Sequence, residues 1–131
     1  MSRKTIGPLY ERTKRFGLDI VQLVGGLRRS LQTDVIGKQL LCSALSVGAN
    51  YRAACRGRST AEFLAKLGIV EEEADESAYW LEILDEAKLI DPKHAVPLKD
   101  EAEQITAMIV ASIRTARTKQ NTATQTKREP K

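Results

Sequence analysis

Apolar residues recur along this chain at alternating spacings of three and four, the pattern of amphipathic helices that bury one face. The first run starts at Pro8, because proline suits the first helical turn, and extends to about residue 30. The pair Gly25-Gly26 weakens its end, at about 1 kcal/mol per glycine relative to alanine. Its predicted buried seam is Leu9, Thr13, Phe16, Ile20, Leu23 and Leu27.

The second run is rich in small residues, which let helix axes approach closely. We expect it to begin after Thr33 or Asp34, either of which can cap a helix. Asn50 places an amide in the seam, where it either bonds to a nearby backbone carbonyl or fixes the register of the bundle. The seam is Ile36, Leu40, Ser43, Val47, Asn50 and Ala54.

A basic joint, Arg56-Gly57-Arg58-Ser59, precedes the third run, and Ser59 with Glu62 forms the S-x-x-E capping box of a helix start. This helix is predicted to reach about Leu89, with its seam at Phe63, Leu67, Val70, Ala74, Ser77, Leu81 and Leu84. A second stripe, about 100° around the helix, consists of Ile69, Glu73, Glu76, Trp80 and Ile83. Two stripes indicate two packing partners, of which one could be another subunit.

The fourth helix is expected to start near Pro97, after a short loop that Asp91-Pro92 and Val96-Pro97 bracket. Its acidic first turns and basic last turns suit the helix dipole. Beyond Thr118 the sequence is polar and basic without an apolar period, so residues 119–131 are predicted to be a disordered basic tail. The seam is Leu98, Ala102, Ile105, Ile109, Ser112 and Ala116.

These patterns predict an all-α protein in which residues 1–118 form one up-down-up-down antiparallel four-helix bundle, because short connections make successive helices antiparallel neighbours. Cys42 and Cys55 would lie about 20 Å apart on one helix, too far for a disulfide, so we expect reduced and at least half-buried thiols. No apolar run reaches the roughly 20 residues of a membrane span. The basic N-terminus lacks the apolar segment of a secretory signal. We therefore expect a cytoplasmic protein without a membrane partner.

The sequence offers no set of catalytic residues. His94 is the one histidine of the chain and is predicted to lie in an exposed loop, so neither a Glu-x-x-His metal pair nor a Ser-His-Asp arrangement can be built. The glycines at Gly25-Gly26 lack the Lys-Ser/Thr ending of a phosphate loop. The acidic run at residues 71–76 is more simply a solvated helix face than a metal site. We predict no enzymatic activity and no cofactor.

The net charge of +4 conceals a partition of charge along the chain. The third helix is acidic, whereas basic residues gather in the first half and at the C-terminal end. Clustered arginine and lysine are typical of phosphate binding. The alternative is that these cations are solvated or paired with the acids of the third helix. The candidate nucleic-acid-binding residues are Arg12, Lys14, Arg15, Arg28, Arg29, Arg52, Arg56 and Arg58.

The most specific segment is S-V-G-A-N-Y-R-A-A-C-R at residues 46–56, followed by E-F at 62–63, K-L at 66–67, E-A-D-E at 73–76 and Y-W-L-E at 79–82. Over roughly residues 8–90 the chain resembles the bacterial four-helix bundle family whose founding members are encoded by intervening sequences in large-subunit ribosomal RNA genes. The resemblance implies a left-handed bundle that assembles into a ring-shaped homopentamer, without established catalytic residues. The chain is also similar to accessory proteins of diversity-generating retroelements, which share the fold and bind nucleic acid and a reverse transcriptase.

The resemblance also implies a role for the second stripe of the third helix. Glu73, Glu76 and Trp80 match the family pattern, and tryptophan is favoured as an interface anchor, so we expect this stripe to face another subunit. Arg52 and Arg56 match as well and could meet those acids within the chain or across subunits. Our hypothesis is that the protein forms a homopentamer and binds RNA or DNA. A reverse transcriptase is a further candidate partner. The alternative is a protein–protein interaction scaffold that binds no nucleic acid.

Overall fold

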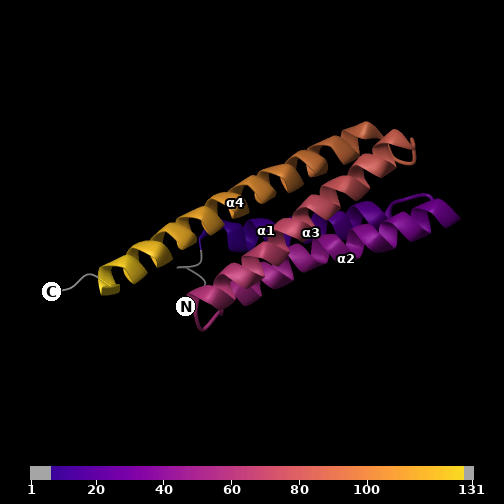
Figure 1. The fold of residues 1–131 in the computed structure, drawn as a ribbon. Coiled ribbons are helices and arrows are strands. Elements are labelled where there is room, and N and C mark those ends of the chain that lie inside the picture. The colour runs from indigo at the N-terminus through magenta and orange to yellow at the C-terminus, as the bar shows by residue number, and fades with distance from the viewer. Residues whose placement is uncertain (1–6, 129–131) are drawn as a thin grey trace.

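The computed structural model describes residues 7–128 and contains four α-helices (Figure 1). They are α1 (Pro8–Gly25), α2 (Leu31–Cys55), α3 (Thr60–Glu86) and α4 (Pro92–Arg128). Because the described residues contain no strand, the all-α prediction is confirmed. Each helix packs against the next one along the chain, and α1 and α4 also touch, over a smaller area. The up-down-up-down topology and the left-handed twist of this four-helix arrangement stay predictions.

Most of the core consists of residues that the seams predict, but Ala44, Tyr51, Ala78 and Ala95 are also buried and belong to no predicted seam. Ser43 and Ser77 lie buried within it, and the Ser77 hydroxyl donates to Ser43 Oγ at 3.0 Å. The amide of Asn50 donates to the Ser46 carbonyl at 2.9 Å, so the local interpretation of this residue is confirmed. Each helix supplies side chains that are almost completely buried, among them Phe16, Ile20, Leu40, Val47, Leu67, Leu81, Leu84, Ile105 and Ile109.

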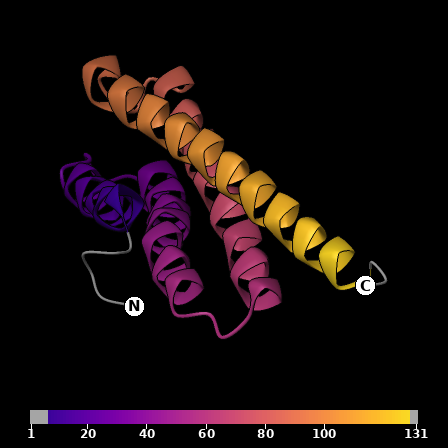
Figure 2. The ribbon, with the colours of Figure 1, turned by 90° about the vertical axis from the view of Figure 1, so that its left-hand side faces the viewer.

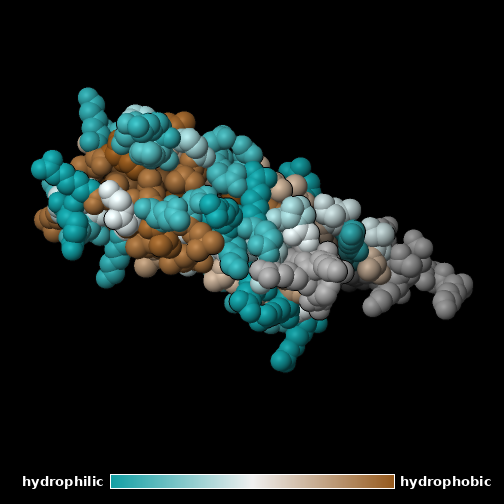
Figure 3. All heavy atoms as spheres, turned by 180° about the vertical axis from the view of Figure 1, so that it is seen from behind, coloured by the Kyte–Doolittle hydropathy of each residue, from teal (hydrophilic) through white to brown (hydrophobic). Residues whose placement is uncertain are grey.

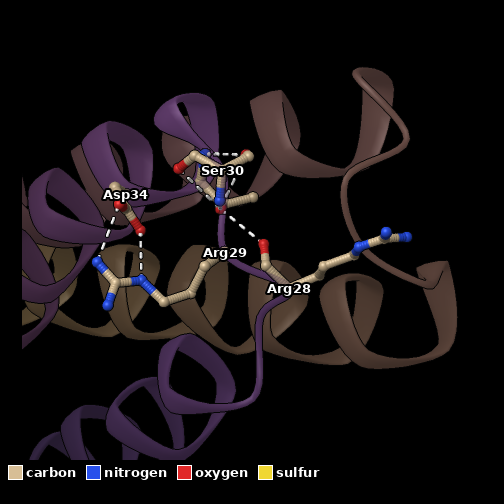
Figure 4. A network of polar contacts seen from close by, with 5 residues as sticks. Arg28, Arg29, Ser30 and Asp34 are labelled. Atoms are coloured by element: carbon tan, nitrogen blue, oxygen red, sulfur yellow. Dashed lines mark hydrogen bonds and ion pairs between the residues drawn. The ribbon is translucent and has the colours of Figure 1, made fainter.

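The connection between α1 and α2 lies earlier in the chain than the sequence predicts, because α1 already ends at Gly25 and α2 already begins at Leu31. Ser30 caps α2, because its Oγ accepts from the Thr33 backbone N–H at 3.1 Å and its own N–H donates to Thr33 Oγ1 at 2.9 Å (Figure 4). Thr33 Oγ1 also donates to the Arg28 carbonyl at 2.8 Å. The prediction that Thr33 or Asp34 caps the helix was wrong, because threonine at the third helical position replaces the glutamate or glutamine of the usual capping box.

The start of α3 agrees with the prediction. Ser59 Oγ accepts from the Glu62 backbone N–H at 3.1 Å, and the Glu62 carboxylate accepts from the Arg58 backbone N–H at 2.9 Å. The helix ends at Glu86, close to the expected Leu89, and Lys88 follows it with a positive φ of 59°. That conformation turns the chain toward α4.

The fourth helix begins earlier than expected, at Pro92. Asp91 caps it, because its side-chain Oδ1 accepts from the Lys93 N–H at 3.0 Å and its carbonyl accepts from the His94 N–H at 2.9 Å. Pro97 lies inside the helix, where it removes one backbone hydrogen bond without ending the helix. The predicted loop is therefore helical, and His94 is exposed on a helix rather than in a loop.

The far end of α4 also differs from the prediction. We expected a disordered tail over residues 119–131, but α4 continues to Arg128, and residues 129–131 lie outside the described part. No glycine or proline interrupts the sequence between Pro97 and Arg128. A helix already nucleated by its packed part adds residues at little cost, so no apolar seam is required there. Figure 2 shows α4 diverging from the other helices toward this end.

The small residues of α2 bring its backbone against that of α1. A Cβ atom on Gly48 would lie 3.3 Å from the Thr13 carbonyl oxygen and 3.5 Å from the Lys14 Cα atom. A Cβ atom on Gly17 would lie 3.6 Å from the Ala44 carbonyl oxygen. The two helices therefore touch through main-chain atoms, which cannot move aside as a flexible side chain can.

Replacing two helical glycines by alanine should distinguish the effect of the close contact between α1 and α2 on stability from the effect of helix propensity. In Gly68→Ala the new methyl group meets nothing within 4 Å, so the free energy of unfolding should rise by about 0.5–1 kcal/mol. In Gly48→Ala the same gain is offset by the displacement of α1, so no rise is expected. Urea denaturation measures both values. An equal rise in the two variants would show that α1 and α2 are not in close main-chain contact.

Candidate nucleic-acid interface

Arg12 is the one predicted nucleic-acid-binding residue that reaches across the bundle. Its guanidinium on α1 donates to both carboxylate oxygens of Glu101 on α4, at 2.7 and 2.6 Å, and to Gln104 Oε1 at 2.8 Å. This hydrogen bonding to Glu101 raises the pKa of Arg12. Within the chain Arg12 therefore has a structural role, because its charge is paired with Glu101. Its contact with nucleic acid stays a prediction.

The remaining predicted cations do not form one surface. Arg28 and Arg29 lie in the connection after the C-terminal end of α1 (Figure 4), whereas Lys14 lies in the N-terminal half of that helix. Arg29 pairs with Asp34 at 3.1 Å, and Arg15 pairs with Asp19 at 3.1 Å. Arg28 precedes α2 and Arg56 follows it, so the 25 residues of that helix separate them.

Four predicted cations do share one end of the bundle. Lys14 and Arg52 line a groove between α1 and α2, and Arg56 and Arg58 lie in the connection from α2 to α3. All four are exposed, and the described residues offer none of them an ion pair within 4 Å. This end carries positive charge that the described protein does not neutralise.

The C-terminal half of α4 adds three cations that the sequence analysis missed as site residues. Arg114 and Arg117 line a groove between α4 and the first half of α3, together with Leu64 and Gly68. Lys119 follows them, and all three cations are exposed. The sequence analysis explains Arg114 and Arg117 by the helix dipole and places Lys119 in the predicted tail. We call the combined surface the basic pole; it consists of Lys14, Arg52, Arg56, Arg58, Arg114, Arg117 and Lys119.

The second stripe of α3 is only partly exposed. Trp80 is half-buried against the core and meets the exposed ring of Tyr79 edge-on, with 5.0 Å between ring centroids. Its indole Nε1 is buried and has no hydrogen-bond partner among the described residues. Burial raises the pKa of Glu73, and the charges of Glu76 and Glu72 raise it further. Along this stripe Ile69 and Glu76 are exposed, while Glu73, Trp80 and Ile83 are intermediate.

A larger apolar surface lies on α1 and α2, and the sequence analysis did not identify it. Figure 3 shows hydrophobic residues gathered on the side of the molecule opposite to the view of Figure 1. Leu45 is 48% exposed and Leu18 is 46% exposed, and both line the groove that holds Lys14 and Arg52. The exposed large apolar residues of these two helices are Leu18, Val21, Leu31, Val35 and Leu45.

The structure bears on three further expectations. Cys42 is exposed rather than buried, Cys55 is half-buried, and both are free thiols on one continuous helix. Residues 7–128 hold no group of three or more side chains that could bind a metal ion. In the same part of the chain, none of the helices combines the length and apolar character that a membrane crossing requires.

The fold and the site thus define a four-helix protein with a basic pole, an apolar surface on α1 and α2, and an acidic stripe on α3. The chain belongs to the 23S rRNA-intervening sequence protein family, whose model matches residues 8–111. It is also similar to the crystal structure of a protein of unknown function from the S23 ribosomal protein family of Bacteroides thetaiotaomicron VPI-5482. The two chains are 31% identical, with a TM-score of 0.76 over 81% of this chain and 95% of that one. No curated protein matches. The predicted family membership is confirmed, and the match extends into α4.

Replacing Arg12 by glutamine should weaken the attachment of α1 to α4. The variant loses a two-pronged, charge-assisted contact, so the free energy of unfolding should fall by about 1 kcal/mol. Arg15→Gln is the matched control, because its pair with Asp19 joins neighbouring turns of one exposed helix surface, and the loss should not exceed about 0.5 kcal/mol. Chemical denaturation compares them. Equal losses would contradict the structural role of Arg12.

Proposed function

We propose that this protein is a non-enzymatic, homo-oligomeric member of its family that binds RNA or DNA in the cytoplasm. The observation that carries the proposal is the basic pole, where exposed cations from α1, α2 and α4 gather without partners in the described protein. Unpaired cations on one surface raise the local concentration of a polyanion, and phosphate groups release counterions when they bind there. A reverse transcriptase remains a candidate partner only through the resemblance to retroelement accessory proteins.

The proposed oligomer is a ring, with five subunits as the family resemblance implies, built from left-handed up-down-up-down bundles. Two different surfaces support it: the apolar and basic groove between α1 and α2, and the acidic second stripe of α3. Contacts between unlike surfaces generate rings when the rotation between subunits closes. Lys14 and Arg52 of one subunit would then neutralise Glu73 and Glu76 of the next, where burial and then the neighbouring carboxylates raise the pKa of Glu73. The other cations of the basic pole would stay exposed.

The second candidate function is a protein–protein interaction scaffold without nucleic-acid binding. The exposed apolar residues of α1 and α2 favour it, since contiguous apolar surface marks interaction sites. In that case Lys14 and Arg52 would serve assembly alone. Arg56 and Arg58 discriminate between the two functions, because neither lines the apolar groove.

Light scattering should show a multimer in solution, and Leu45→Glu should convert it to smaller species. The substitution places a carboxylate in the apolar groove, close to the acidic stripe of the proposed neighbour, which opposes contact. Val96→Glu is the control, because Val96 is 53% exposed on α4 and belongs to neither surface. A wild-type monomer at micromolar concentration, or an unchanged mass for Leu45→Glu, would refute the proposed ring.

Arg56→Gln/Arg58→Gln should reduce the affinity for RNA without dismantling the fold, because both side chains are exposed. For each lost phosphate contact, the log–log salt slope should flatten by about 0.7 for a single strand and about 0.9 for duplex DNA. The control is Arg28→Gln/Lys38→Gln, two exposed cations at the opposite end. Filter binding across a salt series provides the measurement. If the wild type binds neither RNA nor DNA at low salt, the scaffold function takes the place of nucleic-acid binding.

A further inference from the structure

We infer that the basic pole takes double-helical nucleic acid, held by its phosphate backbone, and that the groove between α3 and α4 is a main contact. This inference rests on the proposed nucleic-acid binding and specifies its substrate class. It concerns Arg114 and Arg117, which are separate from the cations that the sequence singled out.

The groove between α3 and α4 has arginines on its α4 side and no bulky side chain at Gly68 on its α3 side. Arg114 and Arg117 are three residues apart on α4, so their side chains project from the same side of the helix, about 5–6 Å apart at Cβ. Gly68 of α3 lies across from them, and a Cβ atom there would meet nothing within 4 Å. Both arginines are exposed, whereas the neighbouring Ile113 packs against the core.

The charged residues around the groove leave Arg114 and Arg117 able to bind an anionic ligand. Neither has an ion pair within 4 Å among the described residues. Glu71 lines the same groove and opposes an anionic ligand. The Glu62 carboxylate is already hydrogen-bonded to the backbone N–H of Arg58. With Arg56, Arg58 and Lys119 near the same end, positive charge dominates over these carboxylates.

The aromatic residues decide between double and single strands. Proteins that hold single strands stack bases on aromatic rings, each worth about 1–3 kcal/mol. Tyr79 is the one exposed aromatic residue of the described chain, and it lies about 28 Å along α3 from Thr60, away from the pole. Phe63 is half-buried and packs against the core, and Tyr10 lines the separate groove of Lys14 and Arg52. No aromatic residue lines the α3–α4 groove of Arg114 and Arg117, so that groove offers no ring on which a base can stack.

Without stacking, affinity depends on phosphate density. A duplex presents one charge per about 1.7 Å of its axis, whereas one of its strands presents one per about 3.4 Å. Cations fixed on three helices and a connection can meet the phosphates of a stiff duplex without ordering it first. The same cations must order a flexible single strand, which costs conformational entropy. The pole should therefore prefer a duplex, with little dependence on base sequence.

Fluorescence anisotropy with the full chain tests this inference, using a labelled hairpin duplex and an unstructured oligo(U) strand with the same number of phosphates. The wild type should bind the duplex at least about tenfold more tightly at equal salt. Arg114→Gln/Arg117→Gln should weaken duplex binding and lower its salt slope by about 0.9 for each arginine that contacts a phosphate. Arg114→Lys/Arg117→Lys should keep most of the slope, because the charge remains. Arg28→Gln/Lys38→Gln should bind like the wild type.

Three results would overturn the inference in distinguishable ways. Equal or tighter binding of oligo(U) would refute the duplex preference and leave nucleic-acid binding intact. Wild-type duplex affinity in Arg114→Gln/Arg117→Gln, combined with a loss in Arg56→Gln/Arg58→Gln, would remove the α3–α4 groove from the site. No binding of either probe would refute the proposed function itself. Circular dichroism and the melting temperature confirm that each variant is folded.

Discussion

The arrangement depends on the main-chain contact between α1 and α2. Where Gly48 faces the Thr13 carbonyl, no room remains for a side chain between the two helices. Larger residues of the same helices must therefore lie beside the contact. Leu18 and Leu45 occupy that position and remain about half exposed. The constraint that joins α1 to α2 thus also produces the apolar groove that a second subunit could cover.

The charged residues fall into two groups. Some are paired within the subunit, and others are exposed without a partner among the described residues. Arg12 is held by Glu101 and fastens α1 to α4, whose mutual contact is the least extensive around the bundle. Arg56 and Arg58 have no such partner among the described residues. On α3 negative charge is in excess, and burial and like charges raise the pKa of Glu73. The proposed oligomer would bring such unlike surfaces together through Lys14 and Arg52 and leave Arg56 and Arg58 open to an anionic ligand.

Local signals predicted most of the fold but misplaced several boundaries. The capping residue Ser59 was identified because its box follows the common S-x-x-E pattern, whereas Ser30 was missed because Thr33 replaces the glutamate. Pro97 suggested a helix start, yet the cap at Asp91 begins α4 earlier and the helix continues through the proline. Residues 119–128 suggested disorder by their polarity, but they extend a helix that the packed part of α4 has already nucleated.

The sequence by itself determined that the chain forms four helices and most of the face that each one buries, because both follow from a periodicity within one segment. Family membership was equally visible in the segment at residues 46–56. Only the tertiary structure decided which distant residues meet, because such contacts depend on how the helices pair. Arg12 and Glu101 are 89 positions apart, and no local pattern links them. The same pairing brings Arg114 close to the start of α3 and places Arg28 at the other end of the molecule.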